Sequence, residues 1–408
     1  MPADRLDQLL REKVTELVRA GTAKHSESVV TGVVAPTATD GPRYLLAGQS
    51  DRAFIRMNSN GYLGMALRAE IIAAEERAVR EFGTGPQAVR FISGTFAPHV
   101  RLEERLAAFH GREAAMVVSS AYATVMAVLP SLVTPETIVI SDELNHNCII
   151  NATRLAQPGQ KRVYPHLDLT QLDGALATAA GSARRAIVVT DGVFSMRGDH
   201  APLDRIMATC AQHDERFPEN VVAVVDDSHG VGAFGATGRG TEEVTGARAD
   251  VLVGTLGKAF GVNGGFVAGS RHLVDYLRET APTYVYSNPI TPAEAAAALA
   301  AVDLLDSDVG LELLRRLRAM TARFRSGLVE LDYETIPGEH PVVPLVVRDT
   351  DRTRSLVAHL HQHGVLATGL AYPVVPQGED EVRFQISADH TLSDIDAVLR
   401  VLEAFPER

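Results

Sequence analysis

Val221-Val-Ala-Val-Val-Asp226-Asp-Ser-His229 and Val251-Leu-Val-Gly-Thr-Leu-Gly-Lys258 are the two stretches that decide the fold. Each begins with an uncharged, largely β-branched run, and polar side chains follow as soon as the run ends. Such runs are typical of strands that are buried on both faces of a parallel sheet. In α/β sheets, ligands bind outside the carboxyl ends of the strands. The two stretches therefore predict two buried strands with a functional site where they end.

The same pattern extends along the middle of the chain. From about residue 114 to 269, apolar runs alternate with helical segments, which implies crossover connections and a mostly parallel sheet covered on both faces. We expect an α/β fold with a large seven-stranded sheet. The predicted strands are 115–119, 137–141, 161–164, 186–190, 221–225, 251–254 and 265–268.

The two ends of the chain predict a smaller α+β unit. Residues 3–20 predict an amphipathic helix whose apolar face should pack on that unit. An alanine- and leucine-rich helix is expected from 292 to about 331, with a break near 306–310. Ser393 and Asp396 suggest a capping box for the last helix. We expect an N-terminal helix and arm (1–56), a large domain (57–291), and a connecting helix with a small C-terminal domain (292–408).

The composition of the chain argues against several classes of function. A formal net charge of −12 argues against a nucleic-acid partner, because phosphate binding favours a basic surface. Cys148 and Cys210 are far apart, so neither a disulfide framework nor a metal site is expected, and a reducing cytoplasm fits. The start of the chain lacks the layout of a signal peptide, and no run reaches the ~20 apolar residues of a membrane helix.

The residues at the predicted strand ends match the requirements of pyridoxal phosphate. Lys258 supplies an amine that can form a Schiff base with the cofactor aldehyde and later move a proton. Asp226 supplies an acid for the pyridine nitrogen, and His229 lies close enough in sequence to reach the ring hydroxyl. Asp227 is the competing anchor, but strand alternation points consecutive side chains to opposite sides. Alone, each segment would more often be a solvated loop charge or a helix cap.

Four further segments add candidates of lower specificity. Residues 117–124 predict a strand followed by a helix start that could cradle a phosphate, with Thr255 nearby; an ordinary capped helix is the alternative. His146 follows another strand and could stack on the cofactor ring or be a structural histidine. Ser195 also follows a strand. Arg383, on a strand near the C-terminus, could clamp a substrate carboxylate or face water.

These motifs resemble the α-oxoamine synthase family of fold-type I pyridoxal phosphate enzymes. The resemblance is carried by Gly254-Thr-Leu-Gly-Lys258, Asp226-Asp-Ser-His229, Leu144-Asn-His146, Asp191-Gly-Val-Phe-Ser-Met196 and Asn60-Gly-Tyr-Leu-Gly64. It extends over nearly the whole chain. Within the family, Arg90-Phe-Ile-Ser-Gly-Thr95 and Tyr284-Val-Tyr-Ser287 are most similar to glycine C-acetyltransferases, which are also called 2-amino-3-ketobutyrate CoA ligases.

The resemblance implies a role for each matching residue. Lys258 would hold the cofactor, Asp226 would pair with its ring nitrogen, and His146 would stack on the ring. His229 and Ser195 would address the ring oxygen. The resemblance also implies a homodimer with shared active sites. The remaining implied contacts are phosphate binding by the backbone of Ala121 and Tyr122, by Thr255 and by Ser287 of the neighbouring subunit, and carboxylate binding by Asn60 and Arg383.

The implied reaction joins an amino acid, glycine in the first instance, to an acyl thioester with release of the thiol. Family members have Cys-Phe-Asp-Ala-Asn where this chain has Ala121-Tyr-Ala-Thr-Val, and small residues where it has Phe260 and Val262-Asn263. These differences leave open another amino acid, a longer acyl-CoA or a carrier-protein thioester. An aminotransferase or lyase on the same fold, and a catalytically silent cofactor-binding regulator, are the remaining alternatives.

Overall fold

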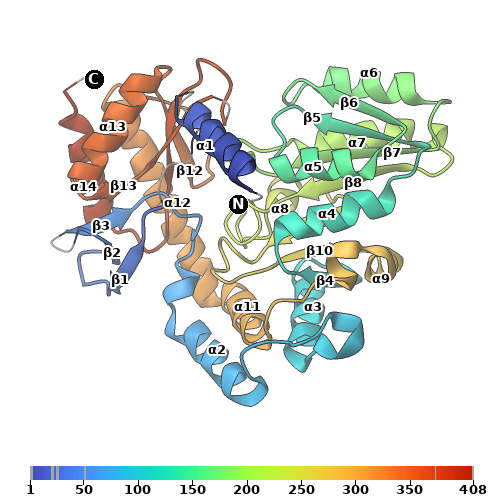
Figure 1. Ribbon diagram of the computed structural model, residues 1–408, viewed down its shortest axis with the longest axis horizontal. Helices are drawn as coiled ribbons and strands as arrows, with labels where there is room; N and C mark the ends of the chain where they lie inside the picture. Colours follow the sequence, from blue (N-terminus) through green and yellow to red (C-terminus); the bar gives the residue numbers. More distant parts are fainter. Residues whose placement is uncertain (1–2, 20–22, 24–26, 50–51, 373, 407–408) are drawn as a thin grey trace.

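A mostly parallel seven-stranded sheet forms the centre of the larger part of the molecule (Figure 1). The computed structural model describes residues 3–19, 23, 27–49, 52–372 and 374–406. The strand order is β4-β10-β9-β8-β7-β5-β6, and β10 alone runs antiparallel to its two neighbours. All seven predicted strands are confirmed, each within one residue of its predicted limits at both ends. They are β4 (Ala114–Val118), β5 (Thr137–Asp142), β6 (Gln160–Tyr164), β7 (Arg185–Asp191), β8 (Val221–Asp226), β9 (Val251–Thr255) and β10 (Gly265–Gly269).

Helices cover both faces of this sheet, as its nearly uninterrupted apolar strands require. One face packs against α4, α5 and α9, and the other packs against α6 and α7. A third apolar core joins α2, α3 and α11 to the edge strand β4 and its neighbour β10. The helices and turns of this part are η1 (Met65–Leu67), α2 (Ala69–Phe82), η2 (Arg90–Gly94), α3 (Ala97–Phe109), α4 (Ala121–Leu132), α5 (Asn147–Ala156), α6 (Leu169–Ala179), α7 (Leu203–His213), η3 (Asp214–Arg216), α8 (Thr241–Thr245), α9 (Arg271–Thr280) and α10 (Pro282–Val285).

The smaller part is built on a second sheet, in the order β11-β12-β15-β14. The long helix predicted from residue 292 is broken where expected, into α11 (Pro292–Leu305) and α12 (Asp308–Glu330). The helices α12 and α14 pack on the apolar face of this sheet through residues such as Phe324, Phe384 and Leu399. The other elements are β11 (Glu334–Thr335), β12 (Val342–Val346), α13 (Thr350–Gln362), β13 (Val365–Leu366), β14 (Thr368–Leu370), β15 (Glu381–Gln385) and α14 (Leu392–Glu403).

The predicted capping box of the last helix was wrong by two residues. Thr391 is the N-cap of α14, its hydroxyl accepts a hydrogen bond from the Asp394 N–H, and the Asp394 carboxylate accepts one from the Thr391 N–H. Both sequence positions satisfy the same pattern of a hydroxyl followed three residues later by an acid. Asp394 is also fixed by Arg43 at 2.6 Å, which selects this register.

The N-terminal arm pairs with the C-terminal part of the chain. Strands β1 (Val30–Val34), β2 (Arg43–Leu46) and β3 (Ala53–Arg56) form an antiparallel ribbon, and β3 pairs in parallel with β13. Ile55 lies opposite Val365 in this pairing. Strand β3 is therefore the element that joins the arm to the other end of the chain.

The N-terminal helix forms, but its expected packing does not. Helix α1 spans Asp4–Arg19, and Ala20 lies outside the described residues. None of the sixteen residues of α1 is buried, and its apolar side chains Leu6, Leu9, Leu10, Val14, Leu17 and Val18 are all exposed. The apolar face that the sequence predicts is thus present and is left uncovered within one chain. No described helix is both long and apolar enough to cross a bilayer.

Candidate active site

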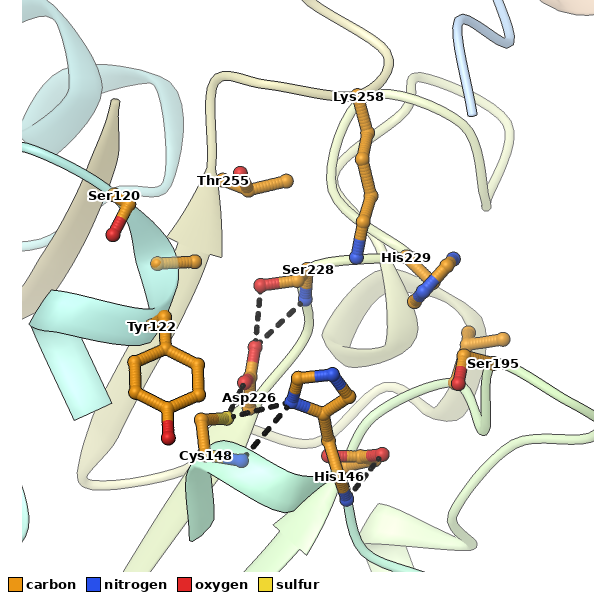
Figure 2. A pocket seen from close by; sticks show the side chains of 13 residues that line it. Ser120, Tyr122, His146, Cys148, Ser195, Asp226, Ser228, His229, Thr255 and Lys258 are labelled. Atoms are coloured by element: carbon orange, nitrogen blue, oxygen red, sulfur yellow. Dashed lines mark hydrogen bonds between the residues drawn. The ribbon is translucent and has the colours of Figure 1, made fainter. Parts of the chain in front are cut away.

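A cavity of about 250 Å³ opens at the carboxyl edge of the seven-stranded sheet (Figure 2). Strand ends β5, β7, β8 and β9 and the start of α4 all contribute to it. Eight of the eleven predicted site residues line its wall. The full set of lining residues is Ser120, Ala121, Tyr122, His146, Cys148, Asp191, Val193, Ser195, Asp226, Ser228, His229, Thr255 and Lys258.

Lys258 is presented by a tight loop that follows β9. The loop is closed by hydrogen bonds from the Leu256 N–H to the Gly264 carbonyl (2.9 Å) and from the Gly261 N–H to the Lys258 carbonyl (3.0 Å). Gly261 has φ of +70°, and a Cβ there would lie 2.5 Å from the Ala66 nitrogen, so only glycine fits. Figure 2 shows the amine of Lys258 pointing into the cavity. Burial lowers its pKa, although Asp226 and Asp191 oppose this shift.

Asp226 is the acid that faces the cavity. Its Oδ1 accepts hydrogen bonds from the Ser228 hydroxyl (2.5 Å) and the Ser228 N–H (3.1 Å), and the Cys148 thiol lies 3.4 Å from Oδ2. Asp227 does not line the cavity. Its carboxylate instead accepts hydrogen bonds from the backbone and the hydroxyl of Thr241, each at 2.7 Å. Strand alternation therefore separates the two acids as expected.

His146 is held from behind as the N-cap of α5. The ring Nδ1 of His146 accepts a hydrogen bond from the backbone N–H of Cys148 (3.2 Å). The backbone N–H of His146 donates to Asp191 Oδ2 (3.1 Å). Burial lowers the pKa of His146, with Asp226 acting against this and Lys258 with it. Because Nδ1 is an acceptor, the ring is neutral with its proton on Nε2. A neutral imidazole suits the face of an aromatic ring.

His229 is fully enclosed by polar neighbours. Its Nδ1 lies 2.8 Å from the hydroxyl of Tyr62, and its carbonyl accepts a hydrogen bond from His340 Nε2 at 2.9 Å. Burial and the charge of Lys258 hold the pKa of His229 well below its usual range. His229 is therefore a neutral ring whose position Tyr62 and His340 fix.

The first turn of α4 forms the opposite end of the cavity. Ala121 and Tyr122 are its first two residues, and Ser120 caps it by accepting a hydrogen bond from the Ala123 N–H at 3.1 Å. The first N–H groups of a helix have no acceptor within the helix, and the helix dipole favours an anion there. Thr255 lines the same end, and its hydroxyl accepts from the Gly257 N–H at 3.1 Å.

Three predicted residues lie outside the cavity wall. Arg383 borders it, because its Nη1 donates to the carbonyl of Ser195 at 2.9 Å. Asn60 lies behind His229, 3.3 Å from the Tyr62 hydroxyl. Ser287 lies between the short helix α10 and α11, and its hydroxyl reaches the Asn288 carbonyl at 3.4 Å. Within one chain the structure therefore does not bring Ser287 to the cavity.

Several lining residues were missed by the sequence analysis. Ser228 stands inside the Asp-Asp-Ser-His motif and could have been found there. Asp191 likewise opens the motif Asp191-Gly-Val-Phe-Ser-Met196 and could have been found there, whereas Cys148 gave no signal of its own, because a lone cysteine after a strand is common. Asp191 Oδ1 is buried without a hydrogen-bond partner among the described residues. Burial and the neighbouring Asp226 raise the pKa of Asp191 well above its usual range.

Comparison with known proteins places this site in a family. A model of the aminotransferase class I and II family matches residues 52–402. An 8-amino-7-oxononanoate synthase of Thermosipho melanesiensis is 39% identical over 352 residues, covering 86% of this chain and 87% of the relative. A mitochondrial 2-amino-3-ketobutyrate coenzyme A ligase of Bos taurus is 37% identical over 402 residues, covering 98% and 91%.

The chain is an α-oxoamine synthase of the aminotransferase class I and II family. A solved serine palmitoyltransferase of Sphingomonas wittichii has the same fold, with a TM-score of 0.88, 26% identity, and coverage of 99% of this chain and 98% of the other. The synthase is an acyltransferase that uses pyridoxal phosphate to condense an amino acid with an acyl thioester. The resemblance and the fold class predicted from the sequence are confirmed.

The cavity fits this cofactor by its donor set. It holds an amine on one wall, a carboxylate with a neutral imidazole beside it, and a helix N-terminus at the far end. These groups match the aldehyde, the pyridine nitrogen, the ring face and the phosphate of pyridoxal phosphate, respectively. The residues that line the cavity of one chain therefore fit pyridoxal phosphate by their chemistry.

Proposed function

We propose that this synthase condenses glycine with acetyl-CoA or another short acyl-CoA. The observation that carries the proposal is the size of the cavity. At about 250 Å³ it lies below the roughly 300–1,000 Å³ of pockets that take drug-sized ligands. The cofactor ring and its phosphate arm occupy much of that volume, which leaves room for an amino acid with little or no side chain.

The extent of the match to known relatives supports the same choice. The bovine 2-amino-3-ketobutyrate coenzyme A ligase aligns with 98% of this chain, whereas the 8-amino-7-oxononanoate synthases align with 85–89% of it. The percentages of identity are nearly equal, so coverage rather than identity favours the ligase.

The proposed cofactor contacts follow from the geometry of the cavity wall. Lys258 would bind the cofactor aldehyde, Asp226 would hold the ring nitrogen, and His146 would lie against the ring. Bound there, pyridoxal phosphate supplies an aldehyde for the amino group and a ring that accepts electrons from the α-carbon. Ser228 and Cys148 would keep the Asp226 carboxylate turned toward the ring nitrogen through the contacts described above.

The remaining contacts hold the two ends of the cofactor. Ala121, Tyr122 and Thr255 would bind the phosphate through backbone N–H groups and a hydroxyl. His229 and Ser195 would face the ring oxygen. All five of these residues line the cavity, which supports the proposed contacts. Ser287 would reach the phosphate of the other subunit in a homodimer.

Arg383 and Asn60 would bind the carboxylate of the amino acid. Burial lowers the pKa of Arg383, but a guanidinium remains charged in proteins. A planar guanidinium can hold a carboxylate through two parallel hydrogen bonds, which fixes the α-carbon in position. Arg383 borders the cavity next to Ser195, on the side where His229 lies.

The chemistry then needs one proton shuttle, for which we propose the amine of Lys258. Its lowered pKa favours the neutral form that can accept the α-proton. A carbon–carbon bond forms between the α-carbon and the acyl carbon, and the carbon–sulfur bond breaks. The thiolate leaves with the proton that the α-carbon lost. The product is an α-amino-β-keto acid together with free CoA.

A homodimer is part of the proposal. Phe91 and Ile92 of η2 are each 65% exposed, and Tyr286 after α10 is 79% exposed. These elements contact each other, and α10 contacts α4, which begins at the cavity. Exposed aromatic and aliphatic side chains clustered beside a site mark an interaction surface. A second copy covering this surface would bring its Ser287 toward the first copy's cavity.

The two cysteines, both free and buried, suit a reducing cytoplasm.

Release of free thiol tests the proposal. The purified protein is mixed with acetyl-CoA and glycine, alanine or serine, and then with longer acyl-CoA or carrier-protein thioesters. Thiol release with glycine and acetyl-CoA is the expected result. Release only with another amino acid or a longer donor would favour the second candidate, a synthase similar to the 8-amino-7-oxononanoate synthases. Exchange with keto acids without thiol release would contradict both.

A further inference from the structure

Two buried residues outside the cavity wall connect Arg383 with His229. Gln385 is 1% exposed and lies two residues after Arg383 on the same face of β15. Tyr62 is fully buried and contacts His229. Neither residue belongs to the proposed set of cofactor and substrate contacts.

The side-chain amide of Gln385 is oriented by its neighbours. One of its terminal atoms lies 2.9 Å from Arg383 Nη2 and 3.1 Å from Arg383 Nε, and a guanidinium can only donate. The other terminal atom lies 3.2 Å from the carbonyl of Met57, which can only accept. Gln385 thus turns its oxygen to Arg383 and its nitrogen to Met57.

This orientation determines the next contact. The same Gln385 oxygen lies 3.1 Å from the end of the Asn60 side chain. Two oxygens would repel at that distance, so Asn60 faces Gln385 with its amide nitrogen. That end of Asn60 also lies 3.3 Å from the hydroxyl oxygen of Tyr62. An amide nitrogen there donates, and the Tyr62 proton is left for another acceptor.

The Tyr62 proton has one acceptor beside it, Nδ1 of His229 at 2.8 Å. Burial raises the pKa of the Tyr62 hydroxyl, so it stays protonated and donates. His229 is neutral, and a neutral ring that accepts at Nδ1 carries its proton on Nε2. Tyr62 thereby fixes which ring nitrogen of His229 donates.

The guanidinium keeps two donors for a substrate. Of its five N–H groups, Nε and one on Nη2 are directed to Gln385, and one on Nη1 is directed to the Ser195 carbonyl. Nη1 also approaches Met196 Sδ at 3.5 Å, so among the described residues one N–H on Nη2 has no assigned acceptor and the second N–H on Nη1 meets only this weakly accepting thioether. A carboxylate held end-on needs one N–H from each of these two nitrogens. Gln385 therefore sets the guanidinium so that these two remain available.

We propose that Gln385 and Tyr62 are positioning residues that couple the substrate clamp to the cofactor contact. Their hydrogen bonds form one continuous chain of side chains, Arg383–Gln385–Asn60–Tyr62–His229. The inference rests on the proposed function in so far as Arg383 binds the carboxylate and His229 faces the cofactor. In this hydrogen-bonded series, the guanidinium of Arg383 has a fixed orientation at one end. The imidazole of His229 has a fixed tautomer at the other end.

Amino-acid binding to the holoenzyme tests the Arg383 end. Glycine is titrated without acyl donor and followed by cofactor absorbance, with methylamine as a probe that lacks a carboxylate. Gln385→Met keeps the volume of the side chain but cannot orient the guanidinium. We expect it to weaken glycine about tenfold, the loss of one or two hydrogen bonds to a charged group, and to leave methylamine unchanged. Tyr44→Phe, at the edge of another cavity, is the matched control and should change neither.

The His229 end is tested by ¹⁵N nuclear magnetic resonance of histidine-labelled holoenzyme, with His229→Gln identifying the signal. Wild type should show Nδ1 unprotonated and Nε2 protonated, and Tyr62→Phe should show a mixture of both tautomers. An unchanged single tautomer in Tyr62→Phe would overturn the coupling at this end. This measurement also decides the matter if Gln385→Met fails to fold.

An Arg383→Lys variant separates failure of the inference from failure of the proposed function. If Arg383→Lys weakens glycine and Gln385→Met binds it as wild type does, Arg383 binds the carboxylate and the role of Gln385 is overturned. If Arg383→Lys also binds glycine normally, the clamp itself is wrong and the inference is overturned with it. A loss of methylamine affinity in Gln385→Met would show general damage and would overturn a role through the carboxylate.

Discussion

Asp226 and Asp227 are adjacent in the chain, yet their carboxylates face opposite sides of the sheet. Asp226 shares its side with Val224 and meets α5 through Cys148, whereas Asp227 is directed to Thr241 at the start of α8. One acid lines the cavity, and the other closes a turn. Burial raises the pKa of Asp227 to about 7, while its two hydrogen bonds to Thr241 oppose that shift.

Alanine at each of these acids should therefore have a different effect. Asp226→Ala should lower the rate of thiol release at least about 100-fold, since it removes an electrostatic contact to the cofactor, with little change in thermal stability. Asp227→Ala should leave two buried donors unpaired and lower the free energy of unfolding by about 2–3 kcal/mol. Thermal denaturation and a thiol assay on the folded fraction distinguish the two. The reverse pattern would assign the anchor to Asp227.

Replacing Lys258 with alanine removes the proposed proton shuttle. Thiol release should fall by about 10³- to 10⁴-fold, in the range expected when an acid–base group is lost. The melting temperature should change little, because the loop is closed by backbone hydrogen bonds rather than by this side chain. A thiol assay on protein loaded with cofactor is the measurement. Thiol release at the wild-type rate would remove Lys258 from the mechanism.

Arg383→Ala should weaken binding of the amino acid and leave binding of the thioester unchanged. Hydrogen bonds to a charged group contribute about 1.5–3 kcal/mol each, so we expect the KM for the amino acid to rise about 10- to 100-fold. The KM for the acyl-CoA should remain within about twofold, because the proposed clamp touches only the carboxylate. Steady-state kinetics with each substrate varied in turn gives both values. An equal rise in both would indicate a collapsed site.

The ion pairs of His166 should make the stability of the protein depend on pH. Burial disfavours its charged form, but hydrogen bonds to Asp142 (3.0 Å) and Asp199 (3.2 Å) raise its pKa to about 9. Because the folded pKa exceeds the unfolded value of about 6.5, this stabilisation is complete below pH ~6.5 and is lost as the pH rises through about 9. The melting temperature of wild type should fall over that interval more steeply than that of His166→Gln. Parallel curves would show that the pairs contribute nothing.

Glu381 should also make stability fall as the pH rises, but through the cost of ionising a buried carboxyl rather than through the loss of ion pairs. It is 4% exposed, its Oε1 has no hydrogen-bond partner among the described residues, and burial raises its pKa to about 8, although Arg383 and Arg197 act against this. Ionisation of this carboxyl is thus more costly in the folded state, and stability should decline from pH ~4.5 upward through about 8. Glu381→Gln removes that decline, so the variant should melt higher than wild type at pH 9 and nearly equally at pH 5. A lower melting temperature at pH 9 would contradict the assignment.

The parts of the fold that could be predicted are those determined by local pattern. The seven strands were found because each is a short apolar run buried on both faces, and Lys258, Asp226 and His146 were found because they directly follow such runs. Tyr62 and Gln385 could not be found in this way. They lie 323 positions apart, and their meaning comes from pairing across the two ends of the chain. A buried tyrosine and glutamine are ordinary core residues when viewed alone.

The N-terminal helix shows a second limit of prediction from the sequence. Its heptad-like apolar pattern correctly predicts a helix with one face that avoids water, but a pattern does not identify what covers that face. In the structure Leu6, Leu10 and Val14 are each more than half exposed. None of the described residues covers this face, which is in keeping with the proposed homodimer.

The parallel pairing of β3 with β13 has a consequence for biosynthesis. Ile55 pairs with Val365, and the Met57 carbonyl accepts a hydrogen bond from the Gln385 N–H, so β3 can form only its pairing with β2 until nearly the entire polypeptide has left the ribosome. Closing a loop of about 300 residues is slow compared with the local closure of the crossover units between them. The nascent seven-stranded sheet can thus mature early while the substrate clamp assembles last. Incomplete chains would then carry a cofactor site without a means to hold an amino acid, which keeps truncated products catalytically silent.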